Sequence, residues 1–242
     1  MPKRTFLINE KGGVGKSYIT KLLALMAEEE KIKTHIIDAD NASASTTKYF
    51  QGISDRKSEY VLYKSENLVG PDRKIDRTKF DTFLETVSQL ENVVVDFGAA
   101  SSEQLCYYLQ EESANGILEI FEELNIQLYV VIAGGGSIKE SIDFFLKLKK
   151  IKGIEKIITI VANEKEGGVN GKSTAEYTKA GIQIPLFHED SNSSAYLEWK
   201  EMMNNGVVYS DIQKLPIIRR KRITSYLNSI FFQIKKNSDD SI

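Results

Sequence analysis

One glycine-rich segment near the start of the chain constrains its fold more than any other feature. Residues 10–17 read Glu-Lys-Gly-Gly-Val-Gly-Lys-Ser, between a strand-like apolar run, Thr5–Asn9, and a helical pattern, Ser17–Glu30. Glycines here let successive backbone N–H groups turn toward one anion, and the positive end of the following helix points at the same place. This order of strand, loop and helix indicates a phosphate-binding loop rather than a surface turn beside a solvated lysine.

Two side chains of this loop supply the chemistry that a phosphate chain needs. Lys16 brings a positive charge to the β- and γ-phosphates of a nucleotide, and Ser17 offers its hydroxyl to Mg²⁺. Backbone N–H groups complete the cradle. The expected nucleotide-binding residues of this segment are Gly12, Gly13, Val14, Gly15, Lys16, Ser17 and, through its backbone N–H, Tyr18.

The rest of the chain alternates short apolar runs with amphipathic stretches. Further strands are expected at Thr34–Asp38, Asn92–Phe97, Ile126–Ala133, Lys156–Ala162 and Ile182–Phe187, and further helices at Arg77–Leu90, after a Ser137 cap, at Ala195–Asn205 and at Pro216–Lys236. Near-continuous apolar strands belong to a parallel sheet that is covered on both faces. The fold class is therefore α/β, a three-layer P-loop fold with a mostly parallel central sheet flanked by helices. Asn41–Lys74 is the least regular segment.

Three aspartates follow predicted strands. Asp38 and Asp40 end the second strand, and Asp96 ends the strand that begins at Asn92. In open α/β sheets ligands bind at the carboxyl ends of the strands, so these carboxylates can converge on the Mg²⁺ at the loop. Because Mg²⁺ keeps several waters, Asp38 and Asp96 can act on it through water, and Ser17 completes the metal site. Capping or surface carboxylates are the alternative.

The run from Lys11 to Ser17 resembles the deviant phosphate loop of the ParA/MinD superfamily, and the resemblance extends from residue 4 to about residue 190. The first glycine of the general pattern is Glu10 here, which the family tolerates. The resemblance implies that Lys11 reaches across a homodimer interface to the partner's nucleotide and is catalytic with Lys16. It also implies that Asp40 positions the attacking water and that Asn163 hydrogen-bonds the adenine of ATP or ADP.

Other matches resemble the conjugal-transfer and plasmid-stability (TraL/StbB-like) branch of that superfamily. They are Ile75–Asp81, Gly134-Gly135 and Asn163-Glu164, together with turns after Asp40 and Asp96 that lack the usual proline. The resemblance implies a slow, partner-stimulated ATPase that dimerises with Mg²⁺ and ATP, and that acts as a switch in plasmid maintenance or conjugative DNA transfer through a protein partner. The alternatives are a metabolic P-loop ligase similar to dethiobiotin synthetase, a membrane-associated MinD-like ATPase and a nucleotide-binding scaffold.

Charge and cysteine content restrict the partners and the location. The 32 Lys and Arg residues against 34 Asp and Glu give a net charge of −2, so nucleic-acid binding requires a local basic patch. The single cysteine, Cys106, excludes a thiol cluster and fits a reducing compartment. Residues 1–10 leave no room for a signal peptide, and we expect a cytoplasmic protein.

Without a linker or repeat, residues 1–236 are expected to form one ATPase domain and 237–242 a frayed tail.

Two further segments have open interpretations. The basic run Arg219, Arg220, Lys221 and Arg222 begins a helix with an apolar stripe. That helix can pack on the domain with its charges solvated, hold DNA phosphates without sequence preference, or lie on an anionic membrane, the first being favoured and the last least. A second glycine-rich stretch, Glu166–Ser173, follows a charged loop rather than a strand and is interpreted as a surface loop.

Overall fold

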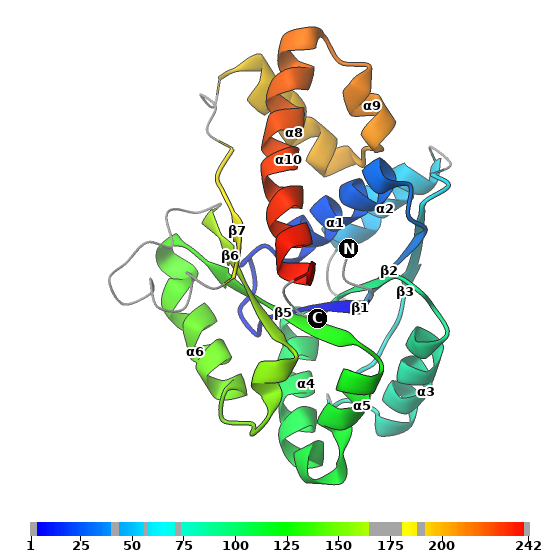
Figure 1. Ribbon diagram of the computed structural model, residues 1–242, viewed down its shortest axis with the longest axis vertical. Coiled ribbons are helices and arrows are strands. Elements are labelled where there is room, and N and C mark those ends of the chain that lie inside the picture. Colours follow the sequence, from blue (N-terminus) through cyan, green and yellow to red (C-terminus); the bar gives the residue numbers. More distant parts are fainter. Residues whose placement is uncertain are drawn as a thin grey trace.

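The centre of the fold is a parallel β-sheet whose middle strand leads into the glycine-rich loop. The structure, a computed structural model, describes residues 4–39, 44–55, 58–70, 74–164, 181–187 and 192–239. Its strands form one seven-stranded sheet in the order β3-β2-β4-β1-β5-β6-β7, in which all neighbours are parallel (Figure 1). Their bounds are β1 Arg4–Ile8, β2 Thr34–Asp38, β3 Val61–Ser65, β4 Val93–Asp96, β5 Ile126–Ala133, β6 Ile158–Asn163 and β7 Ile182–Ile184.

Helices cover both faces of the sheet, which confirms the predicted three-layer α/β fold (Figure 1). One face carries α1 (Lys16–Glu30), α2 (Ala44–Asp55), α8 (Ser194–Asn205), α9 (Tyr209–Gln213) and α10 (Ile217–Asp239); the other carries α3 (Arg77–Ser88), α4 (Ala99–Glu112), α5 (Ile117–Glu123) and α6 (Ile138–Leu148). None of the helices in the described ranges is both long and apolar enough to cross a membrane.

Side chains of each central strand alternate between two cores. In β1, Phe6 and Ile8 pack with α3, α4 and α5, whereas Leu7 packs with α1 and α10. Since helices cover both faces of the sheet, each fully buried apolar side chain adds about 1.5–3 kcal/mol of hydrophobic stabilisation. This double burial is the physical reason why the central strands show apolar runs rather than an alternating pattern.

The segment from Asn41 to Lys74, expected to be the least regular, contains two elements that were not expected from the sequence. α2 buries Tyr49, Phe50 and Ile53 at helical spacing, and β3 adds an edge strand beside β2. β3 has one strand neighbour and exposes part of its side chains, so it lacks the continuous apolar signal of a central strand. α4 and α5 were likewise not expected.

Three predicted boundaries also differ from the structure. Ser137 precedes α6, but its side chain makes no capping hydrogen bond, because a 3-10 turn at Gly135–Ser137 leads into the helix. β7 ends at Ile184, since Pro185 has no N–H to continue the ladder. α10 continues to Asp239, three residues beyond the predicted end.

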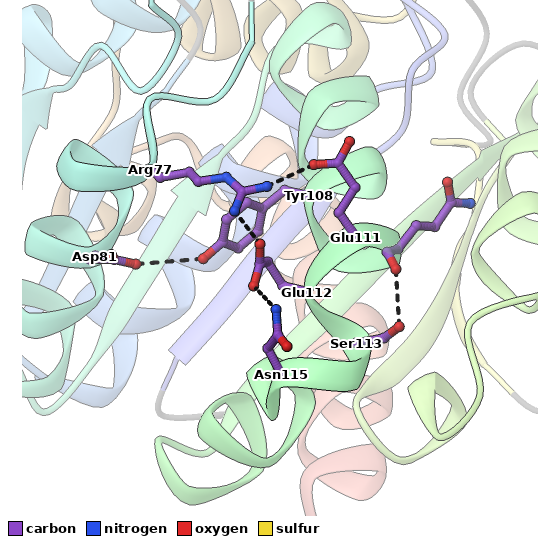
Figure 2. Close-up of polar contacts among 8 residues, drawn as sticks. Arg77, Asp81, Tyr108, Glu111, Glu112, Ser113 and Asn115 are labelled. Carbon is purple, nitrogen blue, oxygen red and sulfur yellow. Dashed lines mark hydrogen bonds and ion pairs between the residues drawn. The ribbon is translucent and has the colours of Figure 1, made fainter.

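Polar contacts on the surface link α3 to α4 (Figure 2). The Arg77 guanidinium is 2.9 Å from the Glu111 carboxylate and also pairs with Glu112. The Tyr108 hydroxyl, from the same face of α4, donates to the Asp81 carboxylate at 3.5 Å. Exposed ion pairs of this kind contribute about 0–1 kcal/mol each, so packing of the apolar faces holds these helices to the sheet.

The backbone of α2 approaches the turn between α8 and α9 closely. Gly206 has a φ of 83°, and a Cβ on it would lie 2.4 Å from the Tyr49 carbonyl oxygen. A Cβ on Gly52 would lie 2.2 Å from the Asn205 carbonyl oxygen. The helices can therefore meet only because both positions lack a side chain.

We predict that Gly206→Ala lowers the free energy of unfolding by about 1–3 kcal/mol, because the new methyl group combines backbone strain with a collision. Urea denaturation measures the change. Gly136→Ala is the matched control, since a Cβ at Gly136 meets nothing within 4 Å. Equal stability of the two variants would show that the close approach does not exist in solution.

Candidate functional site

The glycine-rich loop joins the carboxyl end of β1 to α1 in a conformation that depends on its glycines. Gly13 and Gly15 have φ angles of 81° and 100°, in the left-handed region. Gly15 is the N-cap of α1 and has no side chain, so no side-chain cap competes for the N–H groups of the first turn. Such an uncapped N-terminus attracts an anion.

Asn163, at the end of β6, braces this loop. Its Nδ2 donates to the Val14 carbonyl oxygen at 2.8 Å, and the side chain is 2% exposed. A Cβ on Gly15 would lie 2.0 Å from the same Nδ2. Any larger residue at position 15 would therefore push Asn163 away and open the loop.

Lys16 folds back over the loop. Its Nζ donates to the Asn9 carbonyl oxygen at 2.8 Å and to the Lys11 carbonyl oxygen at 3.4 Å, and its side chain is almost fully buried. The ammonium group is thus held inside the ring of backbone that an anion would enter. Phosphate oxygens can take over from these carbonyl oxygens as stronger, charge-assisted acceptors.

Asn9 is a positioning residue that the sequence analysis took only as the end of a strand. The side chain is fully buried, and its Oδ1 accepts from the Lys11 N–H at 2.8 Å. Its Nδ2 donates to the carbonyl oxygens of Val131 in β5 and Ser141 in α6, at 2.8 and 3.2 Å. One amide therefore fixes the loop to a strand and a helix. A polar residue directly after a buried strand was the available signal.

Two ion pairs tie the first residues of the loop to α6. The Glu10 carboxylate is 2.9 Å from Lys147 Nζ, which also lies 4.2 Å from the centre of the Tyr107 ring. Partial burial alone would lower the pKa of Lys147, but the hydrogen bond and charge of Glu10 raise it. Lys11 Nζ is 3.8 Å from the Glu140 carboxylate, and both side chains are partly exposed. Lys11 thus points at its own subunit's α6.

Asp38 and Asp96 lie side by side at the ends of β2 and β4, as the sequence predicted from their strand positions. Both are buried. Asp38 Oδ2 accepts a hydrogen bond from the Tyr63 hydroxyl at 3.1 Å, and Asp96 Oδ2 accepts one from the Thr46 hydroxyl at 3.3 Å. Burial and the Asp38 charge raise the pKa of Tyr63, so this hydroxyl keeps its proton and remains a donor.

The donor set fits a magnesium ion that shares its ligands with a phosphate. In the part of the chain that the structure describes, no group of three or more His, Cys, Asp or Glu side chains could hold a metal ion by itself. Ser17, Asp38 and Asp96 offer only oxygen atoms, which Mg²⁺ prefers, and Mg²⁺ completes its octahedron with water and phosphate oxygens. Asp40, the predicted water-positioning residue, lies outside the described residues.

A cavity of about 570 Å³ opens from the glycine-rich loop, which is the size range of small-molecule sites. It brings together most of the predicted nucleotide-binding residues: Gly12, Gly13, Gly15, Lys16, Ser17, Tyr18 and Asn163. Val14 is the exception, because its side chain is fully buried in the core. Lys11, Asp38 and Asp96 do not line this cavity.

Part of the cavity lining is aromatic. Phe187, Tyr196, Trp199 and Tyr226 line it beside Pro185 and Leu186. The Phe187 ring meets the Tyr226 ring edge-on with centroids 4.9 Å apart and stacks on the Trp199 ring at 6.3 Å. These residues come from α8, α10 and the segment after β7, and the sequence did not connect the aromatic residues of α8 and α10 with the glycine-rich loop.

The basic run at the start of α10 does not form one uniform patch. The Arg219 guanidinium is 2.7 Å from the Glu198 carboxylate, and Arg220 donates to the Gln213 carbonyl oxygen. Lys221 and Arg222 line a separate hollow of about 460 Å³. The apolar stripe of α10 packs in the core, as favoured from the sequence; its members are Ile223, Leu227, Ile230, Phe231 and Ile234. Glu166–Ser173 lies outside the described residues.

Comparisons with known proteins agree with this geometry. A family model described as the CobQ/CobB/MinD/ParA nucleotide binding domain matches residues 5–198. Two Escherichia coli proteins named Protein TraL are 24% and 25% identical to this chain, over 97% of it and 98% of each relative. A 60-residue stretch, 25% of this chain and 21% of that protein, is 37% identical to an iron-sulfur cluster carrier protein of Clostridium perfringens.

Two solved structures share the fold. Apo McdA from Cyanthece has a TM-score of 0.54 and 15% identity, over 97% of this chain and 98% of that one. A ParA family ATPase from Chlorobium tepidum TLS has a TM-score of 0.52 and 16% identity, over 93% of this chain and 99% of that one. Together with the family model, they confirm the resemblance that the loop sequence implied.

We predict that Asn9→Ala lowers the free energy of unfolding by about 2–4 kcal/mol, because it leaves one buried N–H and two buried carbonyl oxygens without their partner. Urea denaturation is again the measurement. Asn92→Ala is the control, since the exposed Asn92 side chain makes one hydrogen bond at 3.3 Å, and it should cost under about 1 kcal/mol. Similar losses in the two variants would contradict the central role of Asn9.

Proposed function

This chain belongs to the CobQ/CobB/MinD/ParA nucleotide-binding domain family, and we propose that it is a Mg²⁺-dependent ATPase that dimerises with ATP and acts as a switch in plasmid maintenance or conjugative DNA transfer. The observation that carries the proposal is the loop of residues 12–17, which opens with Lys16 and Ser17 into one cavity. The similarity to Protein TraL over nearly the whole chain supports the plasmid-related role.

In this proposal the loop binds the phosphates and the rest of the cavity takes the nucleoside. The backbone of residues 12–18 and the Lys16 ammonium surround the β- and γ-phosphates, to which Val14 contributes only through its backbone. Asn163 lines the same cavity, so its proposed contact with the adenine adds to its hydrogen bond with Val14. Because ATP and ADP share the nucleoside and the β-phosphate, this arrangement is proposed to bind both nucleotides.

Hydrolysis would depend on positioning and charge rather than on covalent chemistry. Ser17, Asp38 and Asp96 are the residues that would hold Mg²⁺, which neutralises phosphate charge when it is bound. Tyr63 and Thr46 keep the two carboxylates in place through the hydrogen bonds to their Oδ2 atoms. Asp40 follows β2 by two residues and is proposed to orient the attacking water.

Lys11 gives the proposed switch its dependence on assembly. In this subunit it pairs with Glu140, so it must leave that carboxylate before it can reach the nucleotide of a partner subunit. An exposed pair of this kind is weak and is exchanged readily for a polyphosphate. The protein partner and a DNA contact through Arg219, Arg220, Lys221 and Arg222 stay predictions from the sequence.

We predict that Asp40→Ala accumulates as an ATP-bound dimer, because the nucleotide is bound but its γ-phosphate is not removed. Gel filtration with light scattering, with and without ATP and Mg²⁺, measures the assembly. Lys16→Ala is the control and should stay monomeric, since it lacks the phosphate-binding charge. A wild type and an Asp40→Ala variant that both stay monomeric with ATP would contradict the switch.

We also predict that Glu140→Gln favours the dimer. Removing an exposed pair worth about 0.2–1 kcal/mol frees Lys11 and should lower the dimer dissociation constant about two- to fivefold with a non-hydrolysable ATP analogue. Sedimentation equilibrium measures the constant. Glu85→Gln, on the exposed face of α3, removes the same charge and should have no effect. A weaker dimer in Glu140→Gln would mean that Glu140 belongs to the interface instead.

A further inference from the structure

A chain of hydrogen bonds runs from the helix of the phosphate loop to α10. The Trp199 indole N–H donates to the Tyr18 hydroxyl at 3.3 Å. The hydroxyls of Tyr18 and Tyr226 are 2.9 Å apart, and the Tyr226 hydroxyl donates to the Pro185 carbonyl oxygen at 3.0 Å. Four segments distant in sequence, namely α1, α8, α10 and the residues after β7, thus meet at one wall of the cavity.

The direction of each hydrogen bond in this series follows from the number of hydroxyl protons that the two tyrosines have. Tyr226 has a single hydroxyl proton and gives it to Pro185, so the bond between the two tyrosines must use the proton of Tyr18. Burial raises the pKa of both tyrosines above the ordinary value, so each keeps its proton at neutral pH. The three donors therefore point one way, from Trp199 through Tyr18 and Tyr226 to Pro185.

The aromatic rings make the same wall rigid. Tyr226 packs edge-on against both Phe187 and Trp199, with centroids 4.9 and 5.8 Å apart. The Trp199 side chain is 4% exposed, and Tyr18 directly follows Ser17 in the sequence. The segment Pro185–Phe187, which lines the same cavity as the glycines, is thus held by a hydrogen bond to Pro185 and by ring contacts to Phe187.

We propose that Tyr18, Tyr226 and Trp199 are positioning residues that fix the Pro185–Phe187 segment as a preformed wall for the nucleoside, so that they set the affinity for the nucleoside part of the nucleotide and not for its phosphates. This inference rests on the proposed function, because it assumes that the phosphates bind at residues 12–17. It gives the Tyr18 side chain a role separate from its backbone N–H.

The physical argument is one of preorganisation. A wall that is already ordered before binding costs the ligand no loop entropy, and loss of one hydrogen bond lets Pro185 and its neighbours move. The phosphate cradle is held separately, by Asn9 and Asn163. Damage to the wall should therefore leave the cradle intact, and the two parts of the site can be tested with two ligands.

The experiment compares ATP with inorganic triphosphate, which offers the phosphates without the nucleoside. Competition against a fluorescent ATP analogue, with Mg²⁺ present, gives both dissociation constants. We expect Tyr18→Phe and Tyr226→Phe to weaken ATP about three- to tenfold, the range for loss of one hydrogen bond, with inorganic triphosphate unchanged. Tyr108→Phe, which removes a hydroxyl that contacts Asp81 away from the cavity (Figure 2), should change neither constant.

The double variant Tyr18→Phe/Tyr226→Phe adds an internal check. Because the two hydroxyls act through one bond, its loss of ATP affinity should be clearly smaller than the sum of the single losses on the free-energy scale. Trp199, the only tryptophan of the chain, supplies an independent signal. Its fluorescence should respond to ATP and remain unchanged with inorganic triphosphate.

The failures of the two proposals are distinguishable. If the wild type binds both ligands but the tyrosine variants behave like Tyr108→Phe, or lose ATP and triphosphate affinity equally, the positioning role is wrong and the nucleotide site stands. If neither ATP nor inorganic triphosphate displaces the analogue from the wild type, the phosphate cradle itself is wrong, and the inference is lost with it.

Discussion

The buried side-chain amide of Asn9 connects the glycine-rich loop to the rest of the molecule. β1 is the central strand, and Asn9, which follows it, is buried and forms hydrogen bonds to β5, α4 and α6. Asn9 supplies an acceptor for Lys11 and donors for Val131 and Ser141 in one side chain. The position of the first residues of the glycine-rich loop relative to β5 and α6 depends on this connection.

The two ion pairs between the glycine-rich loop and α6 differ in burial and in the distance between the charges. Glu10 and Lys147 lie close together and are partly buried, so they anchor the loop to α6. Lys11 and Glu140 are further apart and more exposed, so their contact is easily broken. The same helix therefore holds Glu10 firmly and Lys11 loosely, which suits the proposal that Lys11 acts on a second subunit.

Much of the fold and of the site could be predicted from local sequence. The glycine-rich loop and the strands that end in Asp38 and Asp96 could be recognised from the sequence. The loop conformation requires closely spaced glycines, and strands buried on both faces require continuous apolar runs. β3 was missed because an edge strand is half exposed and mixed in polarity.

The contacts that hold the Pro185–Phe187 segment could not be predicted from sequence for a different reason. Tyr18, Pro185, Trp199 and Tyr226 are separated by up to 208 residues, and their contacts exist only after the sheet has formed. In a one-dimensional pattern Tyr226 belongs to the apolar stripe of α10 and Tyr18 to the first turn of α1. Only the packing of these helices on one face of the sheet brings their hydroxyls together.

A crystal structure with a non-hydrolysable ATP analogue and Mg²⁺ tests the central claim most directly. The account predicts triphosphate oxygens within hydrogen-bond distance of the backbone N–H groups of residues 12–17 and the Lys16 ammonium, the nucleoside against Pro185–Phe187, and Lys11 turned from Glu140 toward a partner's nucleotide. An analogue bound elsewhere on the molecule, with Lys16 still held by the carbonyl oxygens of Asn9 and Lys11, would contradict it.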